Sequence, residues 1–405
     1  MQINKTALNA IVFCAIILFL LIFLMKPFLS IWLLFAGAAF YLALSLHPKK
    51  ITIPFILGLS LVVYTPYIAT KIPWYVLGND KPQYLGFMRD LMQGDFWQSI
   101  SAQPEVVSFL LLKISAEIFG PTNDAFALIF LLSFGSFIIG TYKIYPAASV
   151  AFIALFLASS VSFNIFGNTI RQGLALSFFL LALSQTDRKK ILYVALAVFS
   201  HFSSFIIIPY IMLKPILLKM NSRLILMVAT ALFILGYLLP EIMSNLSFAW
   251  SYLEKKRSLY VEYESTESGA ARITFFLSFF IVFASRLRSI NNLFNESHKI
   301  KPTHQYAMES LYSVTLYLFF ILLLTMQISD FFARFYLYYF TFSMLYITVY
   351  IYTRRNAYIR ISGVSLLILY AFYSMIKNMS YFSLFYCGSS SDYMFDSWLE
   401  INKCF

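Results

Sequence analysis

Long apolar runs recur along this chain and constrain its fold more than any other feature. Most of them last about 17 residues or more, enough for a helix rising ~1.5 Å per residue to cross the apolar core of a bilayer. Backbone groups inside that core must satisfy their hydrogen bonds within the protein, which leaves helices or a closed barrel. The runs lack the period-2 alternation of barrel strands, so the pattern predicts membrane-spanning helices.

The composition agrees with a membrane as the solvent. Hydrophobic residues make up 60% of the 405 residues, charged residues only 12%, and the mean hydropathy is +0.76, whereas soluble domains carry roughly 25% charged residues. The net charge of +12 does not indicate nucleic acid as a partner. Its Lys and Arg residues lie mainly in short loops between apolar runs, where they orient the helices and meet lipid headgroups.

The predicted fold is all-α, a polytopic transmembrane helical bundle forming a single domain over residues 1–405. We expect about eleven full spans and two re-entrant or interfacial segments. The candidate spans are 7–25, 28–46, 51–69, 123–141, 147–166, 169–186, 223–243, 272–285, 306–327, 333–352 and 358–376.

Four basic segments predict the orientation, because cytoplasmic loops are enriched in Lys and Arg. They are 47–50, 187–190, 286–301 and 354–355. With all four inside, the N-terminus is cytoplasmic. The two long loops and the tail then lie outside, at 70–104, 244–271 and 377–405. The first loop has the apolar spacing of an amphipathic helix over 85–100.

This orientation leaves two apolar stretches that cannot be full crossings. Residues 105–120 have outside flanks and contain Lys113 and Glu117, so the segment should lie in the interface or dip in and return. Residues 191–213 have inside flanks, which predicts a re-entrant hairpin turning near His201. Irregular backbone at membrane depth survives only when it is buried in protein or lines a wet cavity. The turn therefore predicts a cavity.

Three arginines at outward helix ends run against the usual charge bias: Arg171, Arg272 and Arg334. A guanidinium binds phosphate in a two-pronged fork, and Arg171 and Arg334 also lie near predicted helix N-termini, which favour anions. One interpretation is a pyrophosphate site. The other is interfacial arginines that extend toward water or pair with Glu267 or Asp330.

Titratable side chains suited to proton transfer occur in the same predicted outer face. His201 is the one histidine inside an apolar run, and it is either a general base or a residue satisfied by neighbouring serines such as Ser203. Asp80 opens the first outer loop, and Glu105 stands where the chain re-enters lipid, an expensive position for a carboxylate. The scattered loop acids otherwise suit solvated positions, and their spacing does not predict a metal site.

Cysteine usage is sparse. Cys14 falls in the first span, and Cys387 and Cys404 fall in the tail predicted to lie outside. A periplasmic location would permit a disulfide between the last two. Their pairing is open.

Several motifs occur in the order found in the EpsG-like and Wzy polysaccharide polymerases of bacterial envelopes, and the chain resembles that family. The similar elements are Gly78-Asn79-Asp80 before Tyr84, the Leu-rich stretch after Glu105, Arg171-Gln172-Gly173 with Ala175, the turn at His201 with Ser203, and a looser Arg334-Phe335-Tyr336. Val106 and Val107 replace the family's Pro-Gly after Glu105.

The resemblance implies a glycosyltransferase that joins oligosaccharide repeat units carried on undecaprenyl pyrophosphate, at the periplasmic face of the inner membrane. It implies no cofactor, and a chain-length regulator protein is a candidate partner. The candidate catalytic residues are His201, Asp80 and Glu105. The candidate substrate-binding residues are Arg171, Gln172, Arg334, Arg272 and Tyr84.

Two other functions share much of this pattern. An O-antigen ligase uses nearly the same donor with a different acceptor. A lipid-linked oligosaccharide flippase would need internal repeats and charges at mid-membrane, whereas the charges here gather at one predicted face.

Overall fold

The computed structural model describes residues 19–44, 52–69, 80–94, 97, 105–245, 272–285, 302–354 and 356–383. All regular secondary structure in these residues is helical, which confirms the all-α fold. Among the described residues, six helices are long and apolar enough to cross a membrane, or seven if a bent pair counts as one span. The first predicted span, the second outer loop beyond Asn245 and the three cysteines lie wholly or mostly outside the described residues. The count of eleven spans stays a prediction.

The helices group into two compact units. The first unit comprises residues 1–205 and 351–405, and the second comprises residues 206–350. In the first unit lie α2 (Pro27–Leu44), α3 (Thr52–Ala69), α4 (Lys81–Gln93), α6 (Val106–Phe119), α7 (Asn123–Ile144), α8 (Pro146–Leu157), α9 (Ser160–Phe163), the π-helical turn η1 (Asn164–Asn168), α10 (Ile170–Leu183), α11 (Lys189–Ser200) and α18 (Ala357–Ser383).

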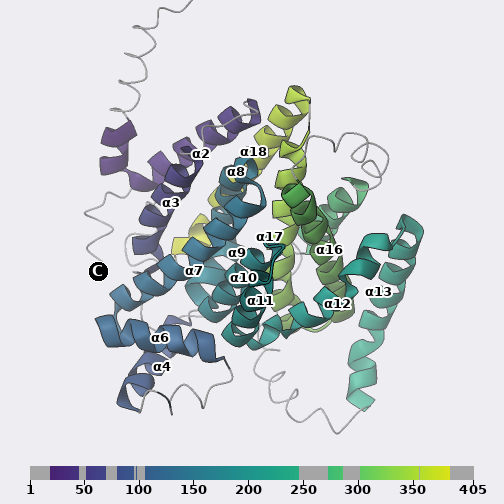
Figure 1. Ribbon diagram of the computed structural model, residues 1–405, viewed down its shortest axis with the longest axis horizontal. Coiled ribbons are helices and arrows are strands. Elements are labelled where there is room, and N and C mark those ends of the chain that lie inside the picture. The colour runs from purple at the N-terminus through teal and green to yellow at the C-terminus, as the bar shows by residue number, and fades with distance from the viewer. Residues whose placement is uncertain are drawn as a thin grey trace, which may run out of the picture. The chain divides into compact units, whose positions relative to one another are not determined.

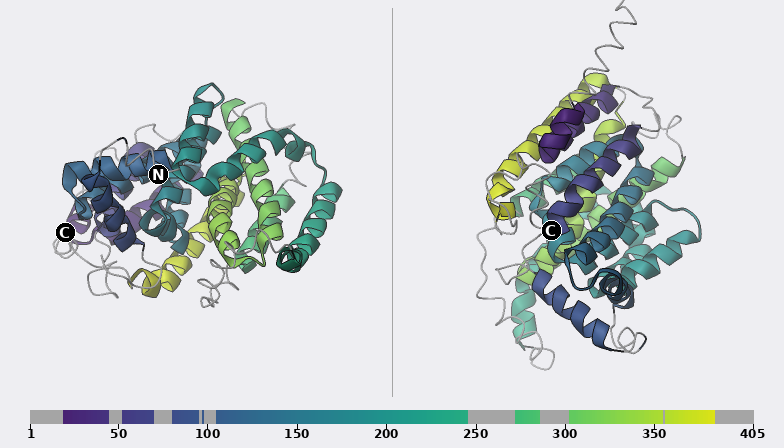
Figure 2. Two further views of the ribbon diagram at one scale, coloured as in Figure 1. Left: turned by 90° about the horizontal axis from the view of Figure 1, so that it is seen from below. Right: turned by 90° about the vertical axis from the view of Figure 1, so that its left-hand side faces the viewer.

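The core of the first unit is built by α7, α8 and α10, whose inward residues are almost all aliphatic or aromatic. α10 packs between α7 and α11, and α3 lies on the other side of α7 (Figure 1). From the far end of the chain, α18 returns to pack beside α2, as the right-hand view of Figure 2 shows in yellow-green and purple. The buried guanidinium of Arg360 secures this return by donating to the carbonyl of Ala43, 2.8 Å away.

The second unit holds α12 (Ile207–Lys219), α13 (Ser222–Asn245), the helix Arg272–Ser285, α16 (Pro302–Thr325) and α17 (Ser329–Tyr352), whose last two residues belong to the first unit. α16 packs against both α12 and α13. The hydroxyl of Tyr210 joins α12 to α16 by a hydrogen bond to the carbonyl of Ser310, 3.1 Å away. α13 keeps most of its apolar side chains exposed, as expected of a lipid-facing helix.

One predicted span is broken. The stretch expected as one helix over 147–166 is split into α8 and the α9–η1 segment, which meet at an angle of 83°. At the break, Ser159 is extended, and its hydroxyl bonds to the carbonyl of Phe156 over 2.6 Å. Serine side chains compete with the backbone for such carbonyls and can end a helix.

The amphipathic helix in the first outer loop is present but shifted. It was expected over 85–100, and α4 instead begins at Lys81 and ends at Gln93. Pro82 stands in the first turn, where its missing N–H costs nothing, and Gly94 follows the last turn. Lys81, Tyr84, Met88 and Leu91 form its buried face. Their spacing of three or four residues is that of one helix stripe.

The two stretches expected to cross only partly are short helices. α6 has 14 residues and is about 21 Å long, less than the apolar core of a bilayer. In the second stretch the chain breaks at His201, as expected, between α11 and the 3₁₀ turn η2 (Phe202–Ile206). Residues Phe202–Lys219 are nevertheless long and apolar enough to cross on their own. The hairpin and the orientation stay predictions.

Candidate functional site

Glu105 stands at the centre of a polar cluster in the first unit. It is the N-cap residue of α6, and its side chain is 7% exposed. One carboxylate oxygen accepts from the backbone N–H of Phe202, 2.9 Å away, and bonds to Nδ1 of His201 over 2.6 Å. The other oxygen receives a hydrogen bond from Nη1 of Arg171. Glu105 therefore joins three segments: the start of α6, the start of α10 and the break after α11.

The electrostatics of this cluster keep Glu105 ionised. Burial, the largest single cause, raises the pKa of its carboxyl. This rise is outweighed by the hydrogen bond and charge of His201, the N–H of Phe202 and the charge of Arg171. The pKa therefore lies below its ordinary value of 4.5. An ionised carboxylate can only accept hydrogen bonds. Nδ1 of His201 must then carry the proton of this bond. In a neutral imidazole this leaves Nε2 with the lone pair that a base needs.

His201 owes its position to the local break in the helix. Its backbone is extended at the C-cap of α11, and its N–H still bonds to the carbonyl of Ala197. The preceding carbonyl, of Ser200, accepts from the hydroxyl of Ser108 on α6, 2.6 Å away. The imidazole is 14% exposed. Its observed partner is Glu105, rather than the neighbouring serines considered from the sequence.

Arg171 lies in the first turn of α10, directly after η1. A π-turn of this kind inserts one residue into the helical ladder and is frequent at functional sites. Gly173 permits the approach of α10 to η1, because a Cβ there would lie 2.6 Å from the carbonyl oxygen of Ile165. The sequence pattern Arg-Gln-Gly thus places an arginine, a buried Gln172 and a close contact in one helical turn.

Three aromatic rings surround the Arg171 guanidinium. Its carbon lies 5.9 Å from the ring centre of Tyr84, 5.8 Å from that of Phe87 and 5.6 Å from that of Phe109. Tyr84 and Phe87 come from α4, and Phe109 comes from α6. Such contacts stabilise a cation away from water. Burial, the largest cause, raises the pKa of the Tyr84 hydroxyl, and the charge of Arg171 opposes the rise.

The Arg171 side chain is 26% exposed and lines a small apolar pocket. Leu111, Leu112, Ile129, Ile170 and Leu174 supply the apolar walls, and Tyr84 and Ser108 supply hydroxyls. A single cation at the edge of such walls suits an amphiphile with an anionic head.

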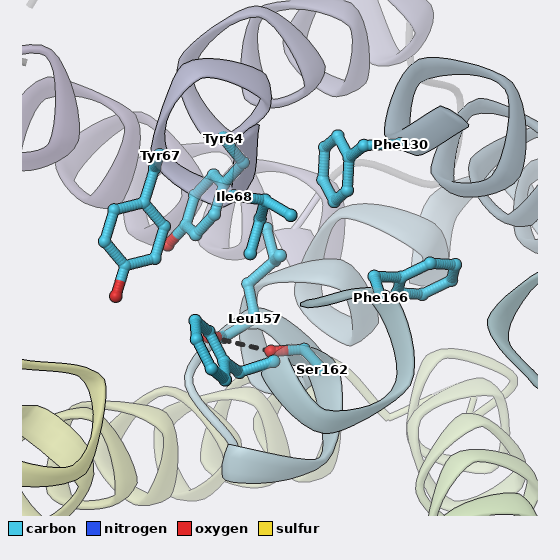
Figure 3. Close-up of a pocket in the computed structure, with 8 residues that line it drawn as sticks. Tyr64, Tyr67, Ile68, Phe130, Leu157, Ser162 and Phe166 are labelled. Carbon is cyan, nitrogen blue, oxygen red and sulfur yellow. Dashed lines mark hydrogen bonds between the residues drawn. The ribbon is translucent and has the colours of Figure 1, made fainter. Parts of the chain in front are cut away.

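A second small apolar pocket lies in the same unit. Figure 3 shows Tyr64 and Ile68 of α3 opposite Leu157 and Ser162 of the bent segment, with Phe130 and Phe166 completing the wall. Phe166 belongs to η1, the turn that leads directly into Arg171.

The remaining sequence candidates lie elsewhere. Asp80 is the N-cap residue of α4, and its charge acts on Tyr84, but no contact joins it to Glu105 in the described structure. Arg272 and Arg334 belong to the second unit, and their convergence with Arg171 stays a prediction. Within the described residues, no three His, Cys, Asp or Glu side chains gather in a metal-binding group.

Sequence reasoning missed Ser108, Phe87 and Phe109 as neighbours of the cluster. Their spacing offered one signal, since Ser108 and Phe109 follow Glu105 at one helical turn.

Comparison with known protein families bears on the whole cluster. A model described as the EpsG family matches residues 59–391, a range that contains every residue of the cluster. No curated protein and no solved structure matches the chain.

Proposed function

Because the chain belongs to the EpsG family, we propose that it is a polysaccharide polymerase that joins oligosaccharide repeat units carried on undecaprenyl pyrophosphate at the periplasmic face of the inner membrane. One observation supports this proposal above the others. A histidine, a buried carboxylate and an arginine meet in one cluster, and the arginine lines a small apolar pocket. These are the groups that glycosyl transfer from a lipid pyrophosphate requires.

The transfer exchanges one bond for another. A hydroxyl at the non-reducing end of the acceptor unit attacks the anomeric carbon of the donor's reducing-end sugar. The new glycosidic C–O bond forms as the bond from that carbon to the pyrophosphate oxygen breaks. Undecaprenyl pyrophosphate leaves with the electron pair, and the hydroxyl proton passes to a base.

We assign the proton transfer to His201. Its Nδ1 donates to Glu105, so Nε2 is available to accept the proton of the attacking hydroxyl. Glu105 already accepts three hydrogen bonds and has a lowered pKa. It is therefore a positioning residue that orients the imidazole and stabilises its charged form, in the manner of the carboxylate in a catalytic triad.

Arg171 is assigned to the leaving group. A guanidinium carries five N–H donors in a planar fork, and Glu105 engages Nη1. A pyrophosphate at the exposed part of the guanidinium gains charge-assisted hydrogen bonds that strengthen as negative charge develops. The first part of the polyprenyl chain would lie against the apolar residues that line the pocket beside Arg171. Arg334 and Arg272 are proposed as further phosphate contacts, Gln172 and Tyr84 as supports of Arg171, and Asp80 as a contact to the incoming sugar.

The test uses the purified full-length protein in liposomes with undecaprenyl-pyrophosphate-linked repeat units. A polymerase produces a ladder of lengthened glycans and one undecaprenyl pyrophosphate per bond formed, and R171A abolishes both. Transfer to lipid A-core alone would indicate the ligase instead. Passage of intact units across the bilayer without new bonds would indicate the flippase. A full-length ladder from R171A would contradict the assignment of Arg171.

A further inference from the structure

Two buried lysines attach α4 to the rest of the first unit. Lys81 is 1% exposed and lies at the start of α4, and Lys113 is 2% exposed and lies in the apolar helix α6. A lysine in an apolar environment costs free energy unless its ammonium is matched by acceptors. Neither lysine takes part in the proposed transfer step, so the burial of each ammonium needs a separate explanation.

Lys81 attaches the first turn of α4. Its Nζ donates to the carbonyl of Ala69 at the end of α3, 2.7 Å away, and to Oδ1 of Asn123 at the start of α7, 2.6 Å away. The ammonium also lies 5.2 Å from the ring centre of Phe126. One side chain therefore holds the start of α4 against two helices of the core.

Lys113 attaches the other end. Its Nζ donates to the carbonyl of Leu91, 2.6 Å away, and to that of Gly94, 3.3 Å away. These carbonyls belong to the last turn of α4 and to the residue after it, where helical carbonyls lack partners within the helix and attract a cation. Glu117, one turn further along α6, lies 3.6 Å from the same ammonium and is half exposed.

Between the two attachments, α4 presents its rings to the site. Tyr84 and Phe87 lie between Lys81 and Leu91 in the sequence, and both rings lie within 6 Å of the Arg171 guanidinium carbon. Phe87 further packs on Phe109 of α6, with ring centres 5.5 Å apart. The position of α4 thus decides how Arg171 is enclosed and which part of it remains open to a ligand.

We propose that Lys113 and Lys81 are positioning residues for substrate binding, because they hold α4 as a fixed aromatic wall over Arg171. The inference rests on the proposed function and adds to it. In this proposal α4 forms part of the pyrophosphate site, and its position depends on the Lys113 ammonium, which neutralises the carbonyl end of α4.

The test compares K113M with K113R. Methionine keeps the size and removes the ammonium, whereas arginine keeps a cation able to reach both carbonyls. In liposomes, K113M should raise the KM for the lipid-linked substrate about tenfold at unchanged kcat, the size expected for losing a hydrogen bond from a charged group. K113R should restore much of the loss. A purely structural role would instead lower the amount of active protein, and so kcat, at unchanged KM.

Hydrogen exchange on the purified protein provides a readout that needs no activity. K113M should speed exchange in residues 84–93 and leave α7 unchanged, and K143M, at an exposed lysine of α7, should change neither exchange nor KM. Unchanged exchange in K113M overturns the proposal, and so does faster exchange at an unchanged KM. If K113M does not accumulate, K113Q takes its place. Unchanged exchange in K113Q, or faster exchange at an unchanged KM, then overturns the proposal. Failure of the proposed function is distinct, because it appears as the absence of polymer from the wild-type protein while the exchange result stands.

Discussion

Nδ1 of His201 lies 2.6 Å from Oε1 of Glu105, although 96 positions separate the two residues. The contact joins the start of one short helix to the break after another. It also determines which imidazole nitrogen can act as a base, because the carboxylate occupies Nδ1. The first prediction follows from this pairing.

Glu105 and His201 should act as a unit. H201A removes the proposed base, and E105Q removes the charge that orients it and stabilises its protonated form. If they share one role, the E105Q/H201A double variant should polymerise no more slowly than H201A alone, because the effects of residues that act together are strongly non-additive. Initial rates of glycan bond formation measure this cycle. D90N, at an exposed position of α4, is the matched control, and additive losses would argue for separate roles.

Arg171 should not tolerate lysine. A lysine keeps the charge but loses the planar fork that bonds both to Glu105 and to a phosphate. R171K should therefore lose about tenfold to a hundredfold in kcat/KM, the range expected for one to two hydrogen bonds to charged groups. Rates with purified lipid-linked units test this. R89K, at an exposed arginine on α4, should behave as wild type. A near-normal rate for R171K would indicate that the fork geometry is not used.

Lys81 should make stability depend on pH under mildly basic conditions. Burial lowers the pKa of its amine from 10.5 to about 8. Between these values the unfolded chain binds a proton that the folded chain has released, so the contribution of this group to stability rises with pH. The thermal unfolding midpoint of wild type relative to K81M should therefore increase as the pH rises from about 8 toward 10.5. An equal difference across that range would contradict the lowered pKa.

Gly173 should be intolerant of alanine, whereas Gly58 should accept it. A Cβ on Gly173 would lie 2.6 Å from the carbonyl oxygen of Ile165, so η1 and α10 would have to separate. Overpacking of this kind costs roughly 1–3 kcal/mol. At Gly58 nothing lies within 4 Å of an added Cβ, and alanine in a helix is favoured by about 0.5–1 kcal/mol. Thermal unfolding of G173A and G58A in detergent compares the two. Equal midpoints would contradict the close approach at η1.

Much of the helix pattern could be predicted from the residues alone. The spans expected over 51–69, 123–141 and 223–243 correspond to α3 (Thr52–Ala69), α7 (Asn123–Ile144) and α13 (Ser222–Asn245). A bilayer imposes this on any apolar run of sufficient length, because unsatisfied backbone groups are too costly in lipid. The breaks were harder to predict. The 83° bend near Ser159 depends on local competition between a serine and the helix, and a hydropathy pattern carries little sign of it.

The residues of the candidate site could be predicted in part from the sequence, but their contacts could not. Arg171, His201 and Glu105 could each be singled out by sequence, because a charged or titratable group in an apolar segment needs a reason to be there. Their roles could not be assigned from sequence. The sequence makes Glu105 a candidate base, and the three hydrogen bonds that it accepts support our proposal that it orients His201.

The apolar runs by themselves determined that this chain forms a polytopic bundle of helices, because runs of this length favour lipid and their backbone groups must then bond within the protein. Only the tertiary structure decided which groups the polar exceptions contact. Glu105, Arg171 and His201 lie on three different segments, and Lys81 and Lys113 reach acceptors 12 and 22 positions away. The strength of such contacts depends on distances of a few ångströms between groups remote in the chain. These distances arise when the helices pack.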